Sequence, residues 1–197
     1  MTDNDDGHMT DFNRFGAITA SVVAAILRVE GETRSRKWAW RVITGREPER
    51  EANWDQERGI DHEEDAIAHL ESELCALARP GRYVAHPSIP FLGASPDGFI
   101  LEDGLEIPLE AKCPRKLHVA VPPMYYAQMQ VQLECCNAPH GYFVSWVEDS
   151  DAQFMQKVVR DAAWWANAFP ELEAFHRDYI LADVEPPTSP RRKKDAV

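Results

Sequence analysis

A tight turn in the middle of the chain constrains the fold most. The turn residues Glu102-Asp103-Gly104 separate two short apolar runs, residues 99–101 and 105–111. Asp-Gly between such runs favours a two-residue turn, because both positions tolerate positive φ angles. The pattern therefore predicts an antiparallel hairpin, in which the residues before the first strand lie close to the end of the second.

The two ends of this hairpin carry acidic and basic side chains. Asp97 lies in Ser95-Pro-Asp-Gly98, just before the first strand, and Glu110 and Lys112 end the second. Glu110 and Lys112 are two residues apart, so on a strand they point to the same face. We therefore expect Asp97, Glu110 and Lys112 to surround one point, close to the main-chain carbonyl of Ala111.

Two carboxylates and a lysine in this arrangement suit metal-assisted cleavage of a phosphodiester bond. Carboxylate and carbonyl oxygens bind hard divalent cations, and such a cation activates a water molecule beside the lysine. The same pattern also fits a simpler interpretation. In a salt-bridged hairpin, Lys112 pairs with Asp97 or Glu110 and has no other role.

Two predicted helices carry further polar candidates. Glu63 lies on one of them and is a candidate ligand for a second cation or for a water of the first. The alternative is a solvated acidic helix face, since the chain has 33 acidic residues. On the other helix Gln128 and Gln132 share a face, because they are four residues apart. An amide is not a base, but it orients a lysine, a water or a phosphate oxygen; the alternative is a polar surface.

The order of predicted elements favours an α+β fold. Helices are predicted at 19–30, 34–44, 49–78, 122–136 and 161–181, and strands at 83–85, 91–94, 99–101, 105–111, 141–147 and 154–159. This order indicates a mixed central β-sheet flanked by helices. We expect a single domain at 12–184, after a mobile N-terminus at 1–11 and before a disordered basic tail at 185–197.

Composition excludes several classes of protein. A net charge of −12 argues against a nonspecific nucleic-acid coat protein. A nuclease is compatible with it, because metal-binding acids add negative charge and DNA needs only one basic surface. The candidates for that surface are Arg14, Arg34, Arg36, Lys37, Arg41, Arg115 and Lys116. The sequence has no run of about 18 apolar residues and no signal peptide, so we expect neither a membrane span nor secretion.

The four cysteines predict reduced thiols in a cytoplasmic protein. They are Cys75, Cys113, Cys135 and Cys136, and they form no CxxC motif. Adjacent cysteines are a poor disulfide pair. An iron–sulfur cluster would need a different cysteine arrangement, so none is expected.

Five short motifs follow one another along the chain. They are Arg14-Phe-Gly-Ala-Ile-Thr-Ala-Ser21, Gly59-x-x-x-Glu63, Ser95-Pro-Asp-Gly98, Leu109-Glu-Ala-Lys-Cys-Pro114 and Ala127-Gln-Met-Gln130. In this order they resemble the phage lambda exonuclease, or YqaJ-type, branch of the PD-(D/E)xK nucleases. The resemblance extends from Arg14 to about Val147. It implies a restriction-endonuclease-like core.

The resemblance also implies roles for these residues. The ligands of Mg²⁺ or Mn²⁺ would be Asp97, Glu110, the Ala111 carbonyl and, for a second ion, Glu63. Lys112 would position and help deprotonate the attacking water, and Gln128 would support the lysine and the water. Two ions would stabilise both the entering and the leaving oxygen.

The implied activity is 5′→3′ resection of one strand of linear duplex DNA to 5′-mononucleotides. Members of this branch form ring-shaped homotrimers and work with a single-strand annealing protein, which implies a phage or prophage recombination system in the cytoplasm of a bacterial host. The alternatives are an endonuclease with the same metal centre, or a catalytically silent DNA-binding module on the same scaffold.

The resemblance implies an anchor for the terminal 5′-phosphate. Arg14, Ser21 and Ser95 match it, and the fork of an arginine suits a phosphate. A second phosphate-binding arginine of the family falls at His118, where Arg115 or Lys116 would substitute. The apolar wedge that splits the duplex falls near Gln56, with Trp54 as the nearby bulky residue.

Overall fold

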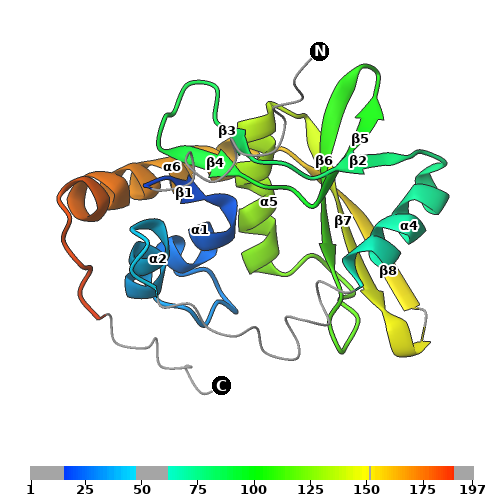
Figure 1. The fold of residues 1–197 in the computed structure, drawn as a ribbon, viewed down its shortest axis with the longest axis horizontal. Helices are drawn as coiled ribbons and strands as arrows, with labels where there is room; N and C mark the ends of the chain where they lie inside the picture. Colours follow the sequence, from blue (N-terminus) through cyan, green and yellow to red (C-terminus); the bar gives the residue numbers. More distant parts are fainter. Residues whose placement is uncertain (1–15, 48–61, 151, 189–197) are drawn as a thin grey trace, which may run out of the picture.

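A five-stranded mixed sheet forms the centre of the molecule (Figure 1). The computed structural model describes residues 16–47, 62–150 and 152–188. In spatial order the strands are β2 (Ala78–Pro80), β5 (Gly98–Glu102), β6 (Leu105–Lys112), β7 (His140–Val147) and β8 (Ala152–Val159). Strands β6 and β7 are parallel and the other pairs are antiparallel. The predicted α+β fold with a mixed sheet is confirmed.

Strands β5 and β6 form the predicted hairpin. Glu102 pairs with Leu105, and the two residues between them have positive φ, 48° at Asp103 and 82° at Gly104. These are the angles of a type I′ turn, whose twist matches that of the strands. The turn fixes the register, and Gly98 at the start of β5 therefore lies opposite Leu109, one residue before Glu110.

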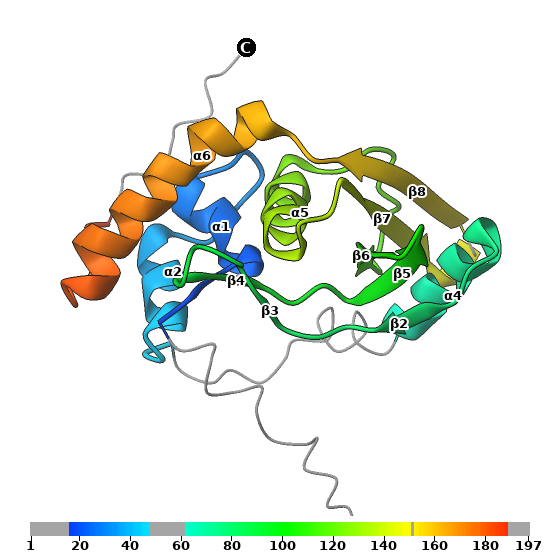
Figure 2. The ribbon, with the colours of Figure 1, turned by 90° about the horizontal axis from the view of Figure 1, so that it is seen from above.

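Two helices cover the two faces of this sheet. Helix α5 (Pro123–Cys136) connects β6 to β7 and packs on one face, while α4 (Glu63–Leu74) packs on the other (Figure 2). Pro123 suits the first position of α5, since proline lacks the N–H that is unpaired there. The helix ends at Asn137, whose φ of 49° is a left-handed C-cap.

Helix α5 also separates the sheet from a second layer of helices (Figure 2). That layer contains α1 (Ala20–Leu27), α2 (Arg36–Ile43), α6 (Ala162–Phe175) and the π-helical turn η2 (His176–Leu181). A small sheet lies beside it, in the order β1 (Ile18–Thr19), β4 (Leu92–Ala94) and β3 (Val84–Ala85). Its β1–β4 pair is parallel and ties the start of α1 to the segment just before Ser95.

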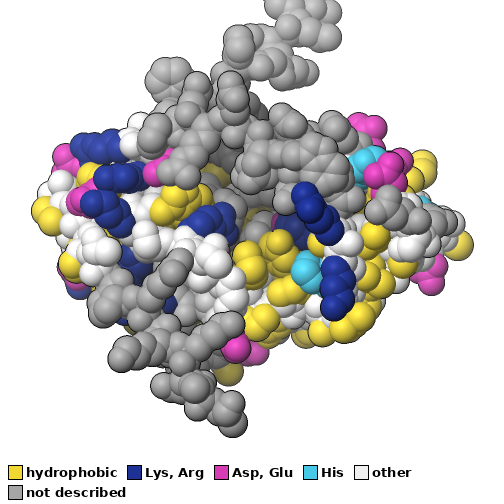
Figure 3. Space-filling model, turned by 90° about the horizontal axis from the view of Figure 1, so that it is seen from below, with side chains coloured by type: hydrophobic (Ala, Val, Ile, Leu, Met, Phe, Trp, Pro, Cys, Tyr) yellow, Lys and Arg dark blue, Asp and Glu magenta, His cyan; other side chains and the backbone are white. Residues whose placement is uncertain are grey.

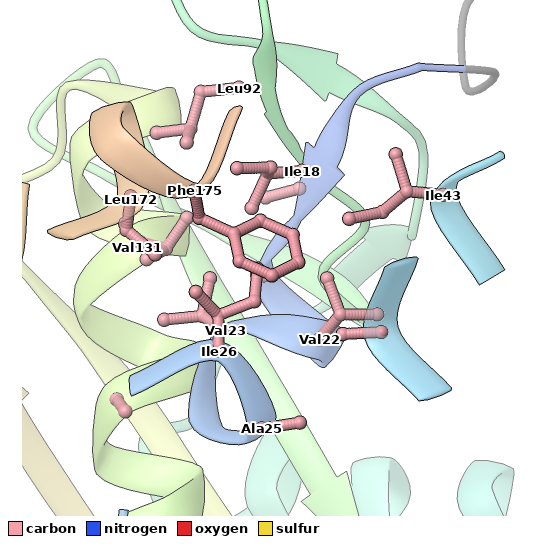
Figure 4. Packing of buried hydrophobic residues seen from close by; sticks show 14 of the residues in the cluster. Ile18, Val22, Val23, Ala25, Ile26, Ile43, Leu92, Val131, Leu172 and Phe175 are labelled. Atoms are coloured by element: carbon pink, nitrogen blue, oxygen red, sulfur yellow. The ribbon is translucent and has the colours of Figure 1, made fainter. Parts of the chain in front are cut away.

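The hydrophobic core has two clusters that meet at α5. Ala127, Val131 and Cys135 face the helical layer, where Phe175 packs between the helices (Figure 4). Met129 and Leu133 face the sheet. A helix that is apolar on both sides is buried, and α5 therefore holds the two layers of the molecule together.

The sequence prediction was wrong about the end of the helix that carries Glu63. The predicted helix at 49–78 begins outside the described residues, and α4 ends at Leu74, with Cys75 at a left-handed φ of 51°. Residues 78–80 form β2 instead, paired with β5. Leu77, an apolar residue of the predicted helix, is 82% exposed. A proline at position 80 is tolerated in β2 because this strand is at the edge of the sheet.

The described C-terminal residues contact helix α2. Glu185, the first residue of the expected tail, forms ion pairs with Lys37 and Arg41, and Pro186 is buried. All four cysteines lie in the described residues, and no disulfide joins any of them. Among the described helices, none is both long and apolar enough to span a membrane.

Candidate active site

Asp97 and the end of strand β6 are joined by two hydrogen bonds. The main-chain N–H of Asp97 donates to the carbonyl of Leu109 at 3.1 Å, and the N–H of Ala111 donates to Oδ2 of Asp97 at 2.7 Å. Gly98 permits the close approach of β5 to both neighbouring strands, because a Cβ there would lie 3.0 Å from the carbonyl oxygen of Arg79 on β2 and 3.2 Å from a side-chain carbon of Leu109 on β6. The hairpin therefore places the carboxylate of Asp97 beside β6.

Lys112 lies among three oxygen atoms. Its Nζ is 2.8 Å from the carbonyl oxygen of Ala111 and 3.6 Å from Oδ2 of Asp97, and it forms an ion pair with Oε1 of Glu110. The three predicted residues thus converge on one point. The ammonium shows that these oxygens surround a position that accepts positive charge, and two carboxylates with a carbonyl are the donors that Mg²⁺ prefers.

Glu110 is completely buried and is held by two glutamines. Nε2 of Gln128 donates to its Oε1 and Nε2 of Gln132 donates to its Oε2, both at 2.5 Å. Burial, together with the negative charge of Asp97, raises the pKa of Glu110 to about 7, although the charge of Lys112 opposes this shift. The two amides and the ammonium favour the ionised carboxylate, which is the form that binds a metal ion.

The carboxylates keep Lys112 positively charged. Burial alone would lower the pKa of its ammonium, but the nearby charges of Glu110 and Asp97 raise it well above its usual value. In this position Lys112 is therefore protonated. It is suited to orient a water and to stabilise negative charge on a phosphate.

Glu63 lies at the first residue of α4, near this group. Burial raises the pKa of its carboxyl, and the charge of Asp97 raises it further, whereas Lys112 lowers it. The charges of Asp97 and Lys112 are close enough to shift the pKa of Glu63. The oxygens that contact Nζ of Lys112 come from Asp97, Glu110 and Ala111. Among the described residues, no three His, Cys, Asp or Glu side chains are grouped to hold a metal ion. The candidate ligands for a metal ion here are therefore two carboxylates and a main-chain carbonyl.

A cavity of about 390 Å³ opens beside these side chains. The residues that line it are Thr19, Ala20, Ser21, Arg34, Ser95, Asp97, Glu110, Lys112, Met124, Tyr125 and Gln128. Strands β6 and β7 end toward the lower side of Figure 1, which is the face seen in Figure 3. Lys and Arg side chains lie on both halves of that face, together with several Asp and Glu side chains (Figure 3).

The structure brings some of the predicted phosphate-binding residues into the cavity and leaves others outside it. Ser21 and Ser95 line it. Arg115 and Lys116 are exposed on the loop after β6 and are not among the lining residues. Three candidates lie outside the described residues, namely Arg14, Trp54 and Gln56.

His118 is turned toward aromatic side chains. The centre of its ring is 5.7 Å from that of Tyr125 and 6.2 Å from that of Phe143. Its main-chain N–H donates a hydrogen bond to Oγ of Ser145. Burial and the charge of Lys112 lower the pKa of this histidine, so the imidazole is neutral at neutral pH. As placed here, His118 does not supply the positive charge expected of a second phosphate-binding arginine.

Sequence reasoning missed two residues of the site. Gln132 was noted only for its place on the helix face of Gln128, yet it contacts Glu110 directly. Its spacing of four residues from Gln128 places both amides on one face of the helix, so this contact could have been predicted. Arg34 was noted only as part of a basic surface. No local pattern indicates that the loop after α1 returns to the cavity.

Comparison with known proteins identifies the family. Residues 12–139 match the YqaJ-like viral recombinase domain. The chain belongs to this family. The match covers the segment that carries all five motifs, and it confirms the resemblance inferred from the sequence. No curated protein sequence matches the chain.

Solved structures support the same conclusion. An alkaline exonuclease from Laribacter hongkongensis, LHK-Exo, is 28% identical and has a TM-score of 0.68, over 87% of this chain and 91% of that protein. Its complex with dAMP has a TM-score of 0.69 over the same shares, at the same identity. A phage-related exonuclease from Haemophilus somnus shares the fold, with 14% identity and a TM-score of 0.63 over 85% of this chain and 95% of that one. The family and LHK-Exo together support a nuclease role that involves binding DNA.

Proposed function

We propose that this chain is a Mg²⁺-dependent exonuclease that degrades one strand of linear duplex DNA in the 5′→3′ direction. The observation that carries the proposal is the convergence of Asp97, Glu110 and the Ala111 carbonyl on one point in the wall of a cavity. Similarity to an alkaline exonuclease over most of the chain supports it. The dAMP bound to that relative fits a mononucleotide product.

The residues of the site suit hydrolysis of the bond between phosphorus and O3′. A divalent cation held by Asp97, Glu110 and the Ala111 carbonyl would activate a water and stabilise charge on the phosphate. Gln128 keeps the Glu110 carboxylate in place, and Lys112 orients the water and stabilises the negative charge that develops. The water oxygen bonds to phosphorus, and a proton passes to the departing O3′. The terminal nucleotide leaves with its own 5′-phosphate.

Further features of the proposal rest on the family. Mn²⁺ would substitute for Mg²⁺. Glu63, whose pKa is raised by the charge of Asp97, would be a ligand of a second ion. The active form would be a ring-shaped homotrimer. The single strand that remains would pass to an annealing protein, in a phage or prophage recombination system of a bacterial cytoplasm.

An assay with labelled DNA tests the proposal. We expect a linear duplex with 5′-phosphates to be degraded to 5′-mononucleotides in Mg²⁺ and to remain intact in EDTA. A covalently closed circle of the same sequence should remain intact in both. Mononucleotides released first from the 3′ end would contradict the proposed polarity, and degradation that is unaffected by EDTA would contradict the metal dependence.

The position of His118 keeps an endonuclease as the second candidate. An end anchor needs positive charge, and the described His118 packs among aromatic rings instead. An endonuclease would cut the closed circle, so the same assay separates the two functions. A catalytically silent DNA-binding module would cut neither substrate and would fail to bind Mn²⁺ in calorimetry.

A further inference from the structure

Arg34 is a basic residue in the wall of the cavity that the proposed function leaves without a role. It lies in the loop between α1 and α2, one residue before Ser35, the N-cap of α2. Oγ of Ser35 accepts a hydrogen bond from the N–H of Trp38 at 3.1 Å. This cap fixes the end of the loop to α2, so the position of Arg34 relative to the cavity depends on a regular element.

Two neighbours hold the guanidinium of Arg34 in one orientation. Its Nε and Nη2 donate to the two carboxylate oxygens of Glu32, at 2.9 Å and 2.5 Å. Its Cζ is 4.4 Å from the centre of the Trp38 ring, a cation–π contact. The Glu32 side chain is only 1% exposed. Burial would raise the pKa of Glu32, but the bonds from Arg34 hold it below its usual value, so the pair is ionised.

The bidentate pair leaves one edge of the guanidinium available. Nη1 of Arg34 donates to none of the described residues, whereas Nε and Nη2 are both engaged by Glu32. The side chain is 38% exposed and lines the cavity. A guanidinium that is already oriented loses little side-chain entropy when it binds a second anion, which makes it an effective phosphate ligand.

The residues beside Arg34 are hydrogen-bond donors. Thr19 and Ser21 contribute hydroxyls that lie 3.2 Å apart, and Ser95, which directly follows β4, contributes a third. The side chain of Thr19 does not cap α1, so the first N–H groups of that helix keep no bond to it. This part of the cavity is rich in donors, and the part formed by Asp97 and Glu110 is rich in acceptors. The two parts therefore suit different groups of one ligand.

The size of the cavity limits how far apart the donor-rich and the acceptor-rich parts are. A volume of about 390 Å³ is at the lower end for ligand sites and suits a single nucleotide. If the carboxylates act on the phosphate at the 3′ side of that nucleotide, the donor-rich part faces the phosphate at its 5′ side. For the last nucleotide of a strand this is the terminal 5′-phosphate.

We propose that Arg34 binds the terminal 5′-phosphate of the strand being degraded, together with Ser21 and Ser95. Glu32 and Trp38 are positioning residues for its guanidinium. Arg34 thus supplies the positive charge that His118 does not supply in this chain. The inference rests on the proposed exonuclease function and adds the residue that makes the enzyme prefer phosphorylated ends.

The test compares two duplexes that differ only in a 5′-phosphate or a 5′-hydroxyl. Initial rates are measured in Mg²⁺, and binding is measured in EDTA by fluorescence anisotropy, for wild type, Arg34→Ala, Arg34→Lys and Arg177→Ala. Arg177 is the matched control, because its guanidinium also donates to both carboxylate oxygens of a neighbouring residue, Asp178, at 2.8 Å and 3.1 Å, and because it is not among the cavity residues. Because Arg34→Ala leaves the buried Glu32 without its partner, a Glu32→Gln/Arg34→Gln double variant replaces the ion pair with neutral amides.

We expect wild type and Arg177→Ala to prefer the phosphorylated end. Arg34→Ala and the double variant should reduce that preference about ten- to hundredfold in both rate and binding, since a charge-assisted hydrogen bond contributes on this scale. Arg34→Lys should reduce it less. An unchanged preference in folded Arg34 variants, or an equal loss on both duplexes, would overturn the role of Arg34 alone. A wild type that degrades neither duplex would overturn the proposed function itself.

Discussion

At the scale of single residues, Glu110 sets the chemistry of the site. It has no exposed surface, and three donors from two elements contact its carboxylate: Lys112, Gln128 and Gln132. A buried carboxylate without such partners would take up a proton. The two amides and the ammonium therefore limit the rise in the pKa of this buried carboxylate, the candidate metal ligand.

Lys112 is expected to be essential for cleavage. The Lys112→Met variant keeps the length and the apolar part of the side chain but removes the charge that orients water and stabilises the phosphate. We expect the rate of duplex degradation to fall at least about a hundredfold, with DNA binding largely retained. Lys157→Met, on the exposed side of β8, is the control and should retain its rate. Near wild-type turnover of a folded Lys112→Met preparation would contradict the mechanism.

Gln132 is expected to affect the metal site more than it affects stability. Its Nε2 donates to Glu110, while its buried Oε1 has no partner among the described residues, so Gln132→Leu removes one good bond and one unpaired polar atom. We expect Mn²⁺ affinity, measured by calorimetry, to fall about tenfold, the usual scale for a residue that holds a ligand. The free energy of unfolding should change by less than about 1 kcal/mol.

Gln130 on the same helix provides the control for this prediction. Its Nε2 donates to the carbonyl of Val159, and its Oε1 accepts from the N–H of Asp161, so both polar atoms are satisfied away from Glu110. Gln130→Leu should lower stability and leave Mn²⁺ affinity unchanged. If Gln132→Leu behaves in the same way, Gln132 has only a structural role.

At the scale of secondary-structure elements, the parts of the site inside the hairpin could be predicted and the parts outside it could not. The Asp103-Gly104 turn sets the β5–β6 register locally, and that register places Asp97 beside Glu110. The four-residue spacing on α5 likewise sets the shared face of Gln128 and Gln132. The end of α4 was mispredicted because residues 78–80 gain more from pairing with β5 than from another turn of helix, and that pairing is not visible locally.

Glu102 connects β5 to β7 across the sheet, and it makes stability depend on pH. It accepts hydrogen bonds from the Tyr142 hydroxyl at 2.6 Å and pairs with Nε2 of His140 at 3.0 Å. Burial would raise the pKa of Glu102, but these partners lower it below 4.5. A group with a lowered folded pKa adds stability above its ordinary pKa and loses it as the pH falls through the folded pKa.

Glu102→Gln is therefore expected to matter at pH 7 and not in acid. By urea unfolding at pH 7, the variant should be less stable than wild type by about 1 kcal/mol. The difference should persist to pH 5 and shrink below about pH 4, where wild-type Glu102 itself takes up a proton. Glu73→Gln, on an exposed position of α4, should show no difference at any pH. If the stability difference between Glu102→Gln and wild type grows in acid, the pKa of Glu102 is not lowered by folding.

At the scale of the whole molecule, the cavity lies between two layers that the chain brings together over long distances. Ser21 and Arg34 come from the helical layer, and Asp97 and Glu110 come from the sheet. The β1–β4 pairing and the packing of α1 on α5 set the distance between these layers. Neither leaves a local pattern in the sequence, so the place of Arg34 in the cavity wall became clear only from the structure.

A metal ion that binds between Asp97 and Glu110 should therefore stabilise the whole fold. In its absence two carboxylates share one site, and the positive charge of Lys112 offsets their repulsion. At a hundredfold excess over its dissociation constant, a bound ion adds about 2.7 kcal/mol to the free energy of unfolding. For a chain of this length, the unfolding temperature should rise by about 5–10 °C. We expect Mn²⁺ to produce this rise over EDTA in a calorimetric scan.

Asp97→Asn distinguishes a specific site from general binding to an acidic protein. The amide oxygen of asparagine still accepts the bond from the N–H of Ala111, so the variant keeps the local structure but loses one charged ligand. Its unfolding temperature should rise by less than a quarter of the wild-type shift, because a hard cation binds a neutral amide weakly compared with a carboxylate. An equal rise in both proteins would place the ion elsewhere on the acidic surface. No rise in wild type would remove the metal from the proposed mechanism, because these oxygens would then bind only the lysine.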